Sequence, residues 1–406
     1  MNSLLDMKVV VMAGGKGTRI ASVNSSLPKP MIPVCGKPIL EWQLEGLKKQ
    51  GLTQFIFIVG HLGSTITEYF GDGSQFGVSI EYIIEKEPLG TAGALFLLKE
   101  KITEDFLLIN GDIIFDIDVE RFYVRHIACG AVAKLFTHPN DHPYDSGIIL
   151  ADNNGKVTGW LHKEDERLWY KNRVNAGLHF LSPRIFEHFN ELKKTDLDRD
   201  IIKPMIPQGT LYVYDSPEYV KDMGTPERYQ AVSEDIASGK VAARNLRNPQ
   251  KAVFLDRDGT LNEYVGFLTD INKFRLLPAA ARMVREINRA GYLAIVVTNQ
   301  PVIARGEMTL EELDLVHAKM ETLLGQEGAY LDDIFYCPHH PDRGFEGERP
   351  EYKIECSCRK PKPGMLLDAA LKYNIDLKLS HMVGDSDRDM QAAREAGIPE
   401  ENLHRL

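Results

Sequence analysis

Two aspartates, Asp256 and Asp258, stand two residues apart at the end of a short apolar run. The run, residues 252–255, predicts a buried strand. Because open α/β sheets bind ligands outside the carboxyl ends of their strands, we expect both carboxylates to face a crevice. One carboxylate placed there can attack phosphorus and form an aspartyl-phosphate, while the other transfers protons. A D-x-D pair alone is also typical of a solvated turn, so the prediction depends on partners elsewhere in the chain.

Three groups downstream supply those partners. A strand predicted at 294–297 ends in Thr298-Asn299-Gln300, a hydroxyl and two amides suited to a phosphoryl oxygen. Lys360 provides a cation for the charge of the transition state. A strand predicted at 381–383 leads to Asp385, a further carboxylate that completes a Mg²⁺ site.

This ordered set resembles the haloacid-dehalogenase (HAD) phosphohydrolase superfamily. The resemblance implies the catalytic residues Asp256, Asp258, Thr298 and Lys360, the Mg²⁺ ligands Asp256, Asp258 and Asp385, and the substrate contacts Asn299, Gln300, Arg305 and Arg359. Pro301 stands where the family usually has a small or hydroxyl residue, so one phosphate contact is lost or replaced. No stretch is long enough for a large cap, and a short loop at 264–270 is expected beside the site.

A cluster of thiols and imidazoles indicates one subgroup of this superfamily. The pattern C-P-H followed by C-x-C-R-K-P offers three thiolates and an imidazole, enough for a closed tetrahedral zinc site. It resembles the subgroup of histidinol-phosphate phosphatases and heptose-1,7-bisphosphate 7-phosphatases, with an insert more like that of the heptose enzymes. The resemblance implies a structural zinc held by Cys337, His339, Cys356 and Cys358, with His340 the less favoured ligand. Three cysteines kept reduced without a metal remain the alternative.

Composition limits the partners and the compartment. A chain of 406 residues is too long for one ordinary domain, and 43% hydrophobic residues supply ample core. A formal net charge of −10 argues against nucleic acid, since phosphate backbones require a basic surface. Five cysteines argue against a disulfide framework, and no leader or long apolar run is present. We therefore predict a cytoplasmic enzyme of small molecules, with no membrane partner and with homo-oligomerisation left open.

The N-terminal part carries a second phosphate-handling pattern. A strand predicted at 9–12 precedes a glycine-rich turn whose backbone N–H groups can approach phosphate closely. Lys29 follows in a stiff proline frame, L-P-K-P-M. Asp112 follows a predicted strand at 106–109, and Asp222 arrives much later. Either aspartate alone is typical of a turn or helix cap, but together they can share one Mg²⁺.

The patterns G-G-x-G-T-R, L-P-K-P-M, P-L-G-T-A-G-A, N-G-D and D-x-G-T-P resemble the sugar-1-phosphate nucleotidylyltransferases, heptose-1-phosphate and mannose-1-phosphate guanylyltransferases above all. The resemblance implies a nucleotide site in which Gly14, Gly15, Gly17 and Thr18 hold the nucleotide, Arg19 and Lys29 act on its phosphates, and Gly90 and Thr91 lie by the base. It implies Mg²⁺ bound by Asp112 and Asp222. It also implies a sugar side lined by Tyr144, Ser146, Gly147, Asn175, Ala176 and Gly177. Lys163 and Glu164 are either sugar or phosphate contacts or part of a solvated charged turn.

We therefore predict an α/β protein of two domains, each a mostly parallel sheet flanked by helices. Residues 1–240 would form a Rossmann-like nucleotidyltransferase fold, 241–250 a linker, and 251–406 a HAD-like fold without a large cap but with a zinc-binding loop.

The two resemblances predict one bifunctional enzyme. It would remove the 7-phosphate of D-glycero-D-manno-heptose 1,7-bisphosphate and transfer GMP from GTP to the heptose 1-phosphate, using Mg²⁺ in both sites. Three alternatives stay open: a mannose-1-phosphate guanylyltransferase joined to a histidinol-phosphate-type phosphatase, a nucleotide-sugar sensor, and a polynucleotide 3′-phosphatase. The acidic balance disfavours the last.

Overall fold

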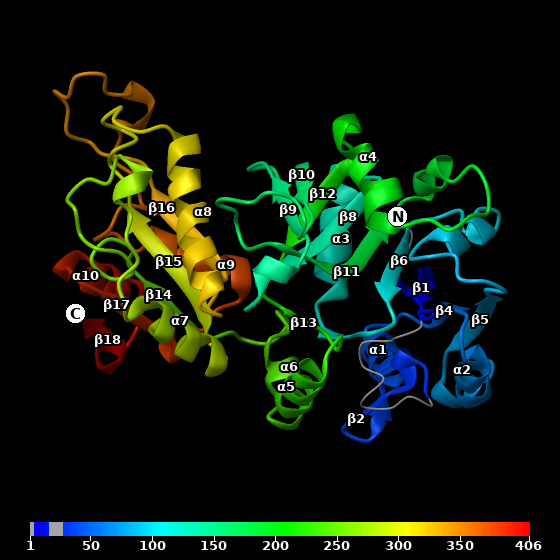
Figure 1. Ribbon diagram of the computed structural model, residues 1–406. Coiled ribbons are helices and arrows are strands. Elements are labelled where there is room, and N and C mark those ends of the chain that lie inside the picture. Colours follow the sequence, from blue (N-terminus) through cyan, green and yellow to red (C-terminus); the bar gives the residue numbers. More distant parts are fainter. Residues whose placement is uncertain (1–3, 16–26) are drawn as a thin grey trace. The chain divides into compact units, whose positions relative to one another are not determined.

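The computed structural model describes residues 4–15 and 27–406, and its chain divides into two compact units (Figure 1). The first unit comprises Met1–Thr137, Ile149–Trp160 and Asn175–Asn245. The second comprises His138–Ile148, Leu161–Val174 and Leu246–Leu406. The last boundary between the units falls at Asn245, inside the stretch predicted as a linker, part of which forms helix α6 (Lys240–Ala243).

Within the described residues, nine strands form the sheet of the N-terminal part. Its central strands β6, β1, β4 and β5 lie side by side in that order and run parallel. Antiparallel β11 continues the sheet from β6 to β9 and β10, and β8 pairs with β11 and β12. These strands are β1 (Lys8–Met12), β4 (Gln54–Val59), β5 (Ser79–Ile84), β6 (Phe106–Asn110), β8 (Ala133–His138), β9 (Ile148–Ala151), β10 (Val157–Leu161), β11 (Val174–Leu181) and β12 (Leu211–Asp215).

Both faces of this sheet are buried, as expected for parallel strands. Val9 and Val11 of β1 pack in one hydrophobic cluster and Val10 packs in the other, because successive side chains point to opposite faces. Three helices cover the first face: α1 (Ile39–Lys48), α2 (Gly63–Phe70) and α3 (Val119–Cys129). Short helical turns cover the second face, at Gly93–Leu98, at Pro183–His188 and from Leu197 through α4 (Lys203–Met205).

Two small strand pairs and one helix complete the N-terminal part. Strand β7 (Ile113–Asp116) pairs antiparallel with β13 (Tyr219–Asp222), and β2 (Pro33–Val34) pairs with β3 (Lys37–Pro38). Helix α5 (Pro226–Ala237) is capped by Thr225, whose side chain accepts a hydrogen bond from the backbone of Arg228. That helix therefore starts four residues after Asp222, the last residue of β13.

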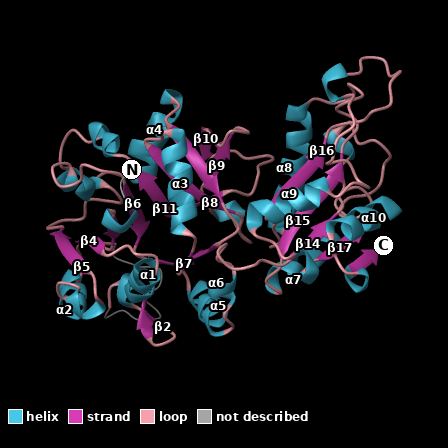
Figure 2. Cartoon of the chain, turned by 180° about the vertical axis from the view of Figure 1, so that it is seen from behind, coloured by secondary structure: helices cyan, strands magenta, loops and turns pink. Residues whose placement is uncertain are grey.

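The second unit is built on an all-parallel sheet of five strands in the described part, in the order β16, β15, β14, β17, β18. Helices α7 and α8 cover one face and α9 and α10 the other (Figures 1 and 2). The elements are β14 (Ala252–Leu255), α7 (Ala280–Arg289), β15 (Leu293–Asn299), α8 (Leu310–Gln326), β16 (Asp333–Cys337), α9 (Gly364–Tyr373), β17 (His381–Gly384), α10 (Asp387–Ala396) and β18 (Leu403–Arg405). The predicted α/β class with parallel-rich sheets is confirmed.

Two segments from earlier in the sequence belong to this second unit, because they pack on helix α8. The backbone N–H of Tyr170 donates to Oγ1 of Thr322 at 2.9 Å, and Arg173 forms an ion pair with Glu321 at 3.0 Å. Pro143 lies against Gly325, where an added Cβ would come within 2.6 Å of its ring. Residues 138–148 and 161–174 are thus structural parts of the unit that carries the C-terminal sheet.

No helix in the two described ranges has both the length and the apolar character needed to cross a bilayer.

Candidate active sites

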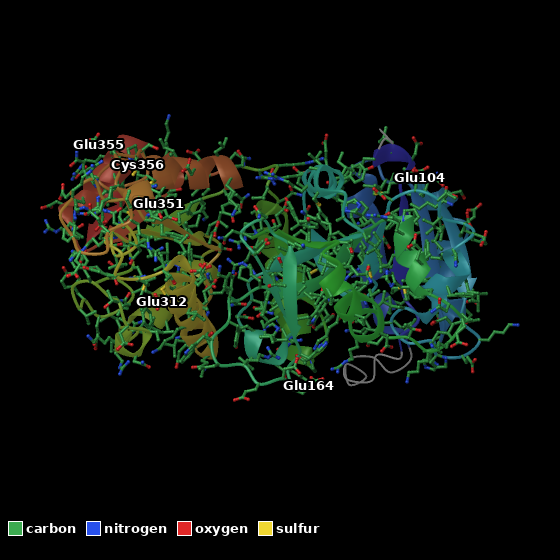
Figure 3. All side chains as sticks on the ribbon, turned by 90° about the horizontal axis from the view of Figure 1, so that it is seen from above. Glu104, Glu164, Glu312, Glu351, Glu355 and Cys356 are labelled. Atoms are coloured by element: carbon green, nitrogen blue, oxygen red, sulfur yellow. The ribbon has the colours of Figure 1, made fainter. Side chains whose placement is uncertain are left out.

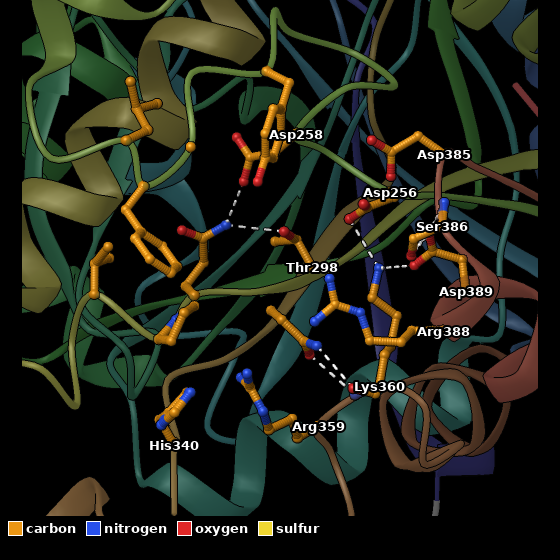
Figure 4. A pocket seen from close by; sticks show the side chains of 18 residues that line it. Asp256, Asp258, Thr298, His340, Arg359, Lys360, Asp385, Ser386, Arg388 and Asp389 are labelled. Atoms are coloured by element: carbon orange, nitrogen blue, oxygen red, sulfur yellow. Dashed lines mark hydrogen bonds and ion pairs between the residues drawn. The ribbon is translucent and has the colours of Figure 1, made fainter. Parts of the chain in front are cut away.

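The first site lies at the carboxyl edge of the C-terminal sheet. Strand β14 sits between β15 and β17, so the residues that follow these three parallel strands meet at one edge. A cavity of about 340 Å³ opens there (Figure 4). Its walls include Asp256, Asp258, Thr298, Asn299, Gln300, Pro301, Arg359, Lys360 and Asp385 from the sequence prediction, and also Tyr264, Phe267, His340, Ser386, Arg388 and Asp389.

Lys360 is held between two carboxylates at the floor of this cavity. Its ammonium nitrogen lies 2.8 Å from Oδ1 of Asp256 and 2.5 Å from Oδ1 of Asp389. Burial acts to lower the pKa of Lys360, but the two carboxylates outweigh it and the pKa is raised, so the lysine stays charged. Burial raises the pKa of Asp256, and Lys360 acts against that rise. The sequence analysis missed Asp389, although it stands four residues after Asp385, in the first turn of α10.

The carboxylate of Asp258 is held in place by the side chains of Arg257 and Gln300. Both of its carboxylate oxygens lie within 3.0 Å of Nη2 of Arg257, and the amide of Gln300 donates to Oδ2 at 3.0 Å. Arg257 is completely buried and also contacts Nε2 of His317 at 3.3 Å. Burial, with Arg257 second, holds the pKa of His317 well below its usual value. His317 is therefore neutral and can accept from the guanidinium.

The carboxylates of this cavity are suited to binding a hard cation such as Mg²⁺. Oxygen atoms of Asp256, Asp385 and Asp389 lie within 4.8 Å of one another. Gly259 has a φ of +85°, and a Cβ there would stand 2.1 Å from Oδ2 of Asp385, so only glycine admits that carboxylate. The predicted Mg²⁺ ligands Asp256 and Asp385 are thus together. The side chain of the third, Asp258, is engaged by Arg257, while Asp389 is engaged by Lys360.

The predicted zinc ligands also come together. Sγ of Cys337 lies 3.5 Å from that of Cys356 and 3.2 Å from that of Cys358, and Nδ1 of His339 lies 3.3 Å from Sγ of Cys358. All four donor atoms lie within 4.8 Å of one another. A hydrogen bond from Cys337 lowers the pKa of Cys358 to about 5, so a thiolate is present at neutral pH. The donor set and its closeness fit a tetrahedral structural zinc. His340 points to the cavity instead.

Arg305 does not line the cavity. Its guanidinium carbon lies 4.2 Å from the ring centre of Phe267 and 4.3 Å from that of Phe345, and Glu307 pairs with it at 2.6 Å. It therefore joins the loops beside the cavity through cation–π contacts. The predicted substrate contact at Arg359 differs, because Arg359 forms part of the cavity wall.

The second site lies at the carboxyl ends of the N-terminal strands. Lys29 is nearly buried and its ammonium lies 2.5 Å from Oδ2 of Asp112, directly after β6. The backbone N–H of Met223 donates to the carbonyl of Asp112, which places Asp222 beside it across β7 and β13. Burial acts to raise the pKa of Asp222, but the Arg228 guanidinium at 2.8 Å outweighs it and the pKa is lowered. Two carboxylates beside a lysine fit a metal-bound phosphate chain.

At Gly90 in the second site, another backbone segment lies too close for a side chain. Gly90 has a φ of +81°, and a Cβ there would lie 2.4 Å from the carbonyl oxygen of Thr195. Thr91 accepts a hydrogen bond from the backbone of Leu197 at 2.8 Å. Gly14 and Gly15 follow β1. The remaining predicted nucleotide contacts, Gly17, Thr18 and Arg19, lie outside the described residues.

The predicted sugar contacts fall into two sets. Asn175, Ala176 and Gly177 lie on β11 in the first unit, and Asn175 approaches the carboxylate of Asp198 at 3.4 Å. Burial raises the pKa of Asp198 to about 7. The sequence analysis missed this carboxylate because it lies in a short helical segment, Leu197–Ile202, without a recognisable motif. Tyr144, Ser146 and Gly147 belong to the second unit, and Tyr144 is 59% exposed. Lys163 and Glu164 are exposed, and Glu164 is labelled near the lower margin of the ribbon in Figure 3.

Comparison with known proteins gives each part a family. The nucleotidyl transferase family model matches residues 8–239, and a HAD-hydrolase-like model matches residues 357–400. A D-glycero-alpha-D-manno-heptose 1-phosphate guanylyltransferase of Aneurinibacillus thermoaerophilus is 32% identical over 57% of this chain and 98% of its own length. A D-glycero-beta-D-manno-heptose-1,7-bisphosphate 7-phosphatase of Photorhabdus laumondii is 45% identical over 36% of this chain and 76% of its own length.

Other relatives agree with this division. The crystal structure of HddC from Yersinia pseudotuberculosis superposes with a TM-score of 0.50 at 27% identity, covering 57% of this chain and 99% of that one. A UTP–glucose-1-phosphate uridylyltransferase of Synechocystis is 29% identical, and the chain spans 66% of its length. The chain thus belongs to the nucleotidyl transferase family through its N-terminal part and joins to it, in one polypeptide, a phosphatase of the HAD superfamily.

Proposed function

We propose that this protein makes a GDP-activated heptose in two steps. The phosphatase part removes the 7-phosphate of D-glycero-D-manno-heptose 1,7-bisphosphate. The nucleotidyltransferase part then transfers GMP from GTP to the resulting heptose 1-phosphate and releases pyrophosphate. GTP and sugar phosphates are cytoplasmic metabolites, so we place both reactions in the cytoplasm.

In the first reaction a carboxylate oxygen of Asp256 attacks the phosphorus, and the bond from phosphorus to the sugar oxygen breaks. Asp258 donates a proton to the departing oxygen and later takes one from the water that hydrolyses the aspartyl-phosphate. Lys360 balances negative charge on the phosphoryl oxygens, and the Thr298 hydroxyl in the cavity wall would donate a hydrogen bond to them. The side-chain amide of Asn299 instead holds the backbone of Lys360, at 2.9 and 3.0 Å. A Mg²⁺ bound by Asp256 and Asp385 would neutralise further phosphate charge.

In the second reaction a phosphate oxygen of the sugar 1-phosphate attacks the α-phosphorus of GTP in line, and the bond to pyrophosphate breaks. No covalent enzyme intermediate is required, so positioning and charge neutralisation suffice. Lys29 provides the cation and Arg19 is proposed to add a second. Asp112 and Asp222 would hold a Mg²⁺ that neutralises the leaving pyrophosphate. Nucleotide binding by Gly14, Gly15, Gly90 and Thr91, and sugar binding by Asn175 and Gly177, belong to this proposal.

One observation carries the proposal: a single chain holds two sites whose relatives are named for consecutive compounds. Removal of one phosphate from a heptose 1,7-bisphosphate gives a heptose 1-phosphate, which the guanylyltransferase relative is named for. The two relatives are named for different anomers, beta for the phosphatase and alpha for the transferase. Both sites must accept the same anomer if they act in sequence.

The test is to incubate the purified chain with GTP, Mg²⁺ and either anomer of heptose 1,7-bisphosphate, and to identify products by mass. We expect phosphate, pyrophosphate and a GDP-heptose from one anomer. Mannose 1-phosphate serves as the competing acceptor. A higher kcat/KM with mannose 1-phosphate, or no phosphate release from either bisphosphate, would contradict the proposal.

A further inference from the structure

Arg257, which stands between the two aspartates of the phosphatase site, is fully buried. Its Nη2 lies 3.0 Å from Oδ1 and 2.8 Å from Oδ2 of Asp258, and its Nε lies 3.2 Å from Oδ1. The side chain of Asp258 is 20% exposed and lines the cavity, so a buried cation holds a carboxylate that faces the substrate. The position of the Arg257 guanidinium therefore determines the position of this carboxylate.

The guanidinium is itself held from helix α8. Its other terminal nitrogen, Nη1, lies 3.3 Å from Nε2 of His317. A guanidinium only donates hydrogen bonds, so Nε2 must be the unprotonated ring nitrogen that accepts. His317 is 2% exposed, lies on the buried face of α8 beside Val316 and Met320, and its ring centre is 5.6 Å from that of Tyr336 on β16. The acceptor is thus fixed by both a helix and the sheet.

Loss of this acceptor would leave part of a buried charge without its hydrogen bond. A buried guanidinium in that state is destabilised and shifts toward another acceptor or toward water. Such a shift moves Asp258, because both of its carboxylate oxygens are bonded to Arg257. Gln300 would move as well, since its Oε1 accepts from Arg257 at 3.1 Å while its amide donates to Asp258 at 3.0 Å.

We propose that His317 is a positioning residue of the phosphatase: through Arg257 it sets the direction in which Asp258 delivers its proton. The proposal rests on the proposed role of Asp258 as the acid of the first step. In that step Asp256 bonds to phosphorus, the bond from phosphorus to the sugar oxygen breaks, and its electron pair stays on that oxygen, which takes the proton of Asp258. A misplacement of about 1 Å slows such a step by a factor on the order of 10².

The test compares two leaving groups. p-Nitrophenolate is a weak base and departs without a proton, whereas a sugar alkoxide requires one. Release of the alcohol or phenol in the first turnover is followed by rapid mixing of the full-length chain and Mg²⁺ with heptose 1,7-bisphosphate or with p-nitrophenyl phosphate. For His317→Leu we expect release from the bisphosphate to slow roughly 100-fold and release from the aryl phosphate less than about threefold.

Two further variants separate positioning from packing. His317→Gln keeps an acceptor, because its amide oxygen can take the hydrogen bond of the guanidinium, and it should stay within about fivefold of the unmodified chain on both substrates. Val316→Ala loosens the same buried face of α8 but leaves the acceptor in place. It should change the two rates by the same factor.

Equal slowing of both substrates in His317→Leu overturns the inference, as does no slowing of either, or a His317→Gln variant as slow as His317→Leu on the bisphosphate. If His317→Leu does not fold, His317→Phe takes its place under the same criteria, because it keeps a ring against Tyr336 and offers no acceptor. Absence of release by the unmodified chain would contradict the proposed function, whereas the outcomes above leave that function intact and refute the role of His317 alone.

Discussion

Lys360 and Asp389 form an ion pair at 2.5 Å in which both side chains are buried, at 3% and 1% exposure. Asp389 also accepts hydrogen bonds from the backbone and hydroxyl of Ser386, so its carboxylate is fixed before it meets the lysine. The pair holds the ammonium of Lys360 beside Asp256. The position of the catalytic cation therefore depends on a residue outside the set that the sequence predicted.

Replacing Asp389 by asparagine removes half of the charge that holds Lys360. Breaking a buried pair costs about 3–5 kcal/mol. We expect phosphate release to fall by a factor on the order of 10² or more, because the cation is no longer positioned. Transfer from supplied heptose 1-phosphate should continue. Asp387→Asn, an exposed neighbour, is the control, and equal phosphate release by the two variants in a steady-state assay would contradict this role.

Asp256→Asn should reveal the order of the two reactions. The side chains predicted as sugar contacts, Tyr144, Ser146 and Asn175, carry no positive charge for a second phosphate, and burying a dianion without a partner costs several kcal/mol. We therefore expect this variant, given GTP and the bisphosphate, to form almost no nucleotide sugar, while heptose 1-phosphate is still converted. Mass detection of a GDP-heptose that retains its 7-phosphate, formed at a comparable rate, would show that dephosphorylation need not come first.

Arg388 is expected to recognise the phosphate that is not removed. It lines the cavity together with Arg359, and Figure 4 shows its side chain on the same side as Lys360. A charge-assisted hydrogen bond is worth about 1.5–3 kcal/mol, so Arg388→Gln should lower kcat/KM for the bisphosphate roughly 10- to 100-fold. Hydrolysis of p-nitrophenyl phosphate, which has no second phosphate, should change little. Arg394→Gln on the same helix is the control, and an equal loss on both substrates would rule out this selectivity.

Cys356→Ser removes one of the four clustered donors and should lower the bound zinc measured by elemental analysis. The thermal midpoint of the second unit should fall by about 5 °C or more, since a structural metal contributes directly to folding. Cys35→Ser, an exposed thiol outside the cluster, should have no such effect. Absence of zinc from the unmodified protein would refute the assignment of this site.

Glu321→Gln should destabilise the second unit, because Glu321 is 2% exposed and would no longer form its ion pair with Arg173. A loss of about 3–5 kcal/mol is expected from breaking a buried ion pair. Urea unfolding followed by tryptophan fluorescence measures it, since Trp169 lies in the segment that packs on α8. Glu327→Gln, an exposed residue just after the same helix, should leave the midpoint unchanged.

The sequence predicted those parts of the fold and of the sites that depend on short motifs and on the ends of strands. The apolar run 252–255 coincides with β14. The thiols and imidazole of the zinc pattern come within 4.8 Å of one another, because Cys337 ends β16 and the loop before α9 brings Cys356 and Cys358 against it. Asp389 and Asp198 were missed since their roles arise only when a helix or turn packs beside the site. The ion pair between Arg257 and Asp258 was missed for a different reason. A charged residue between two aspartates is expected to face solvent, whereas here it is fully buried.

The second unit includes two segments from the middle of the N-terminal sequence, so the order of synthesis affects how the chain folds. Residues 138–148 and 161–174 leave the ribosome long before helix α8, on which they pack. Domains generally fold as they emerge, but these segments must wait until residue 326 or beyond has been synthesised. A gene divided near codon 245 would therefore give an N-terminal product with two segments deprived of their packing surface. Such products tend to aggregate, so co-expression of the two pieces should rescue solubility better than mixing them after purification.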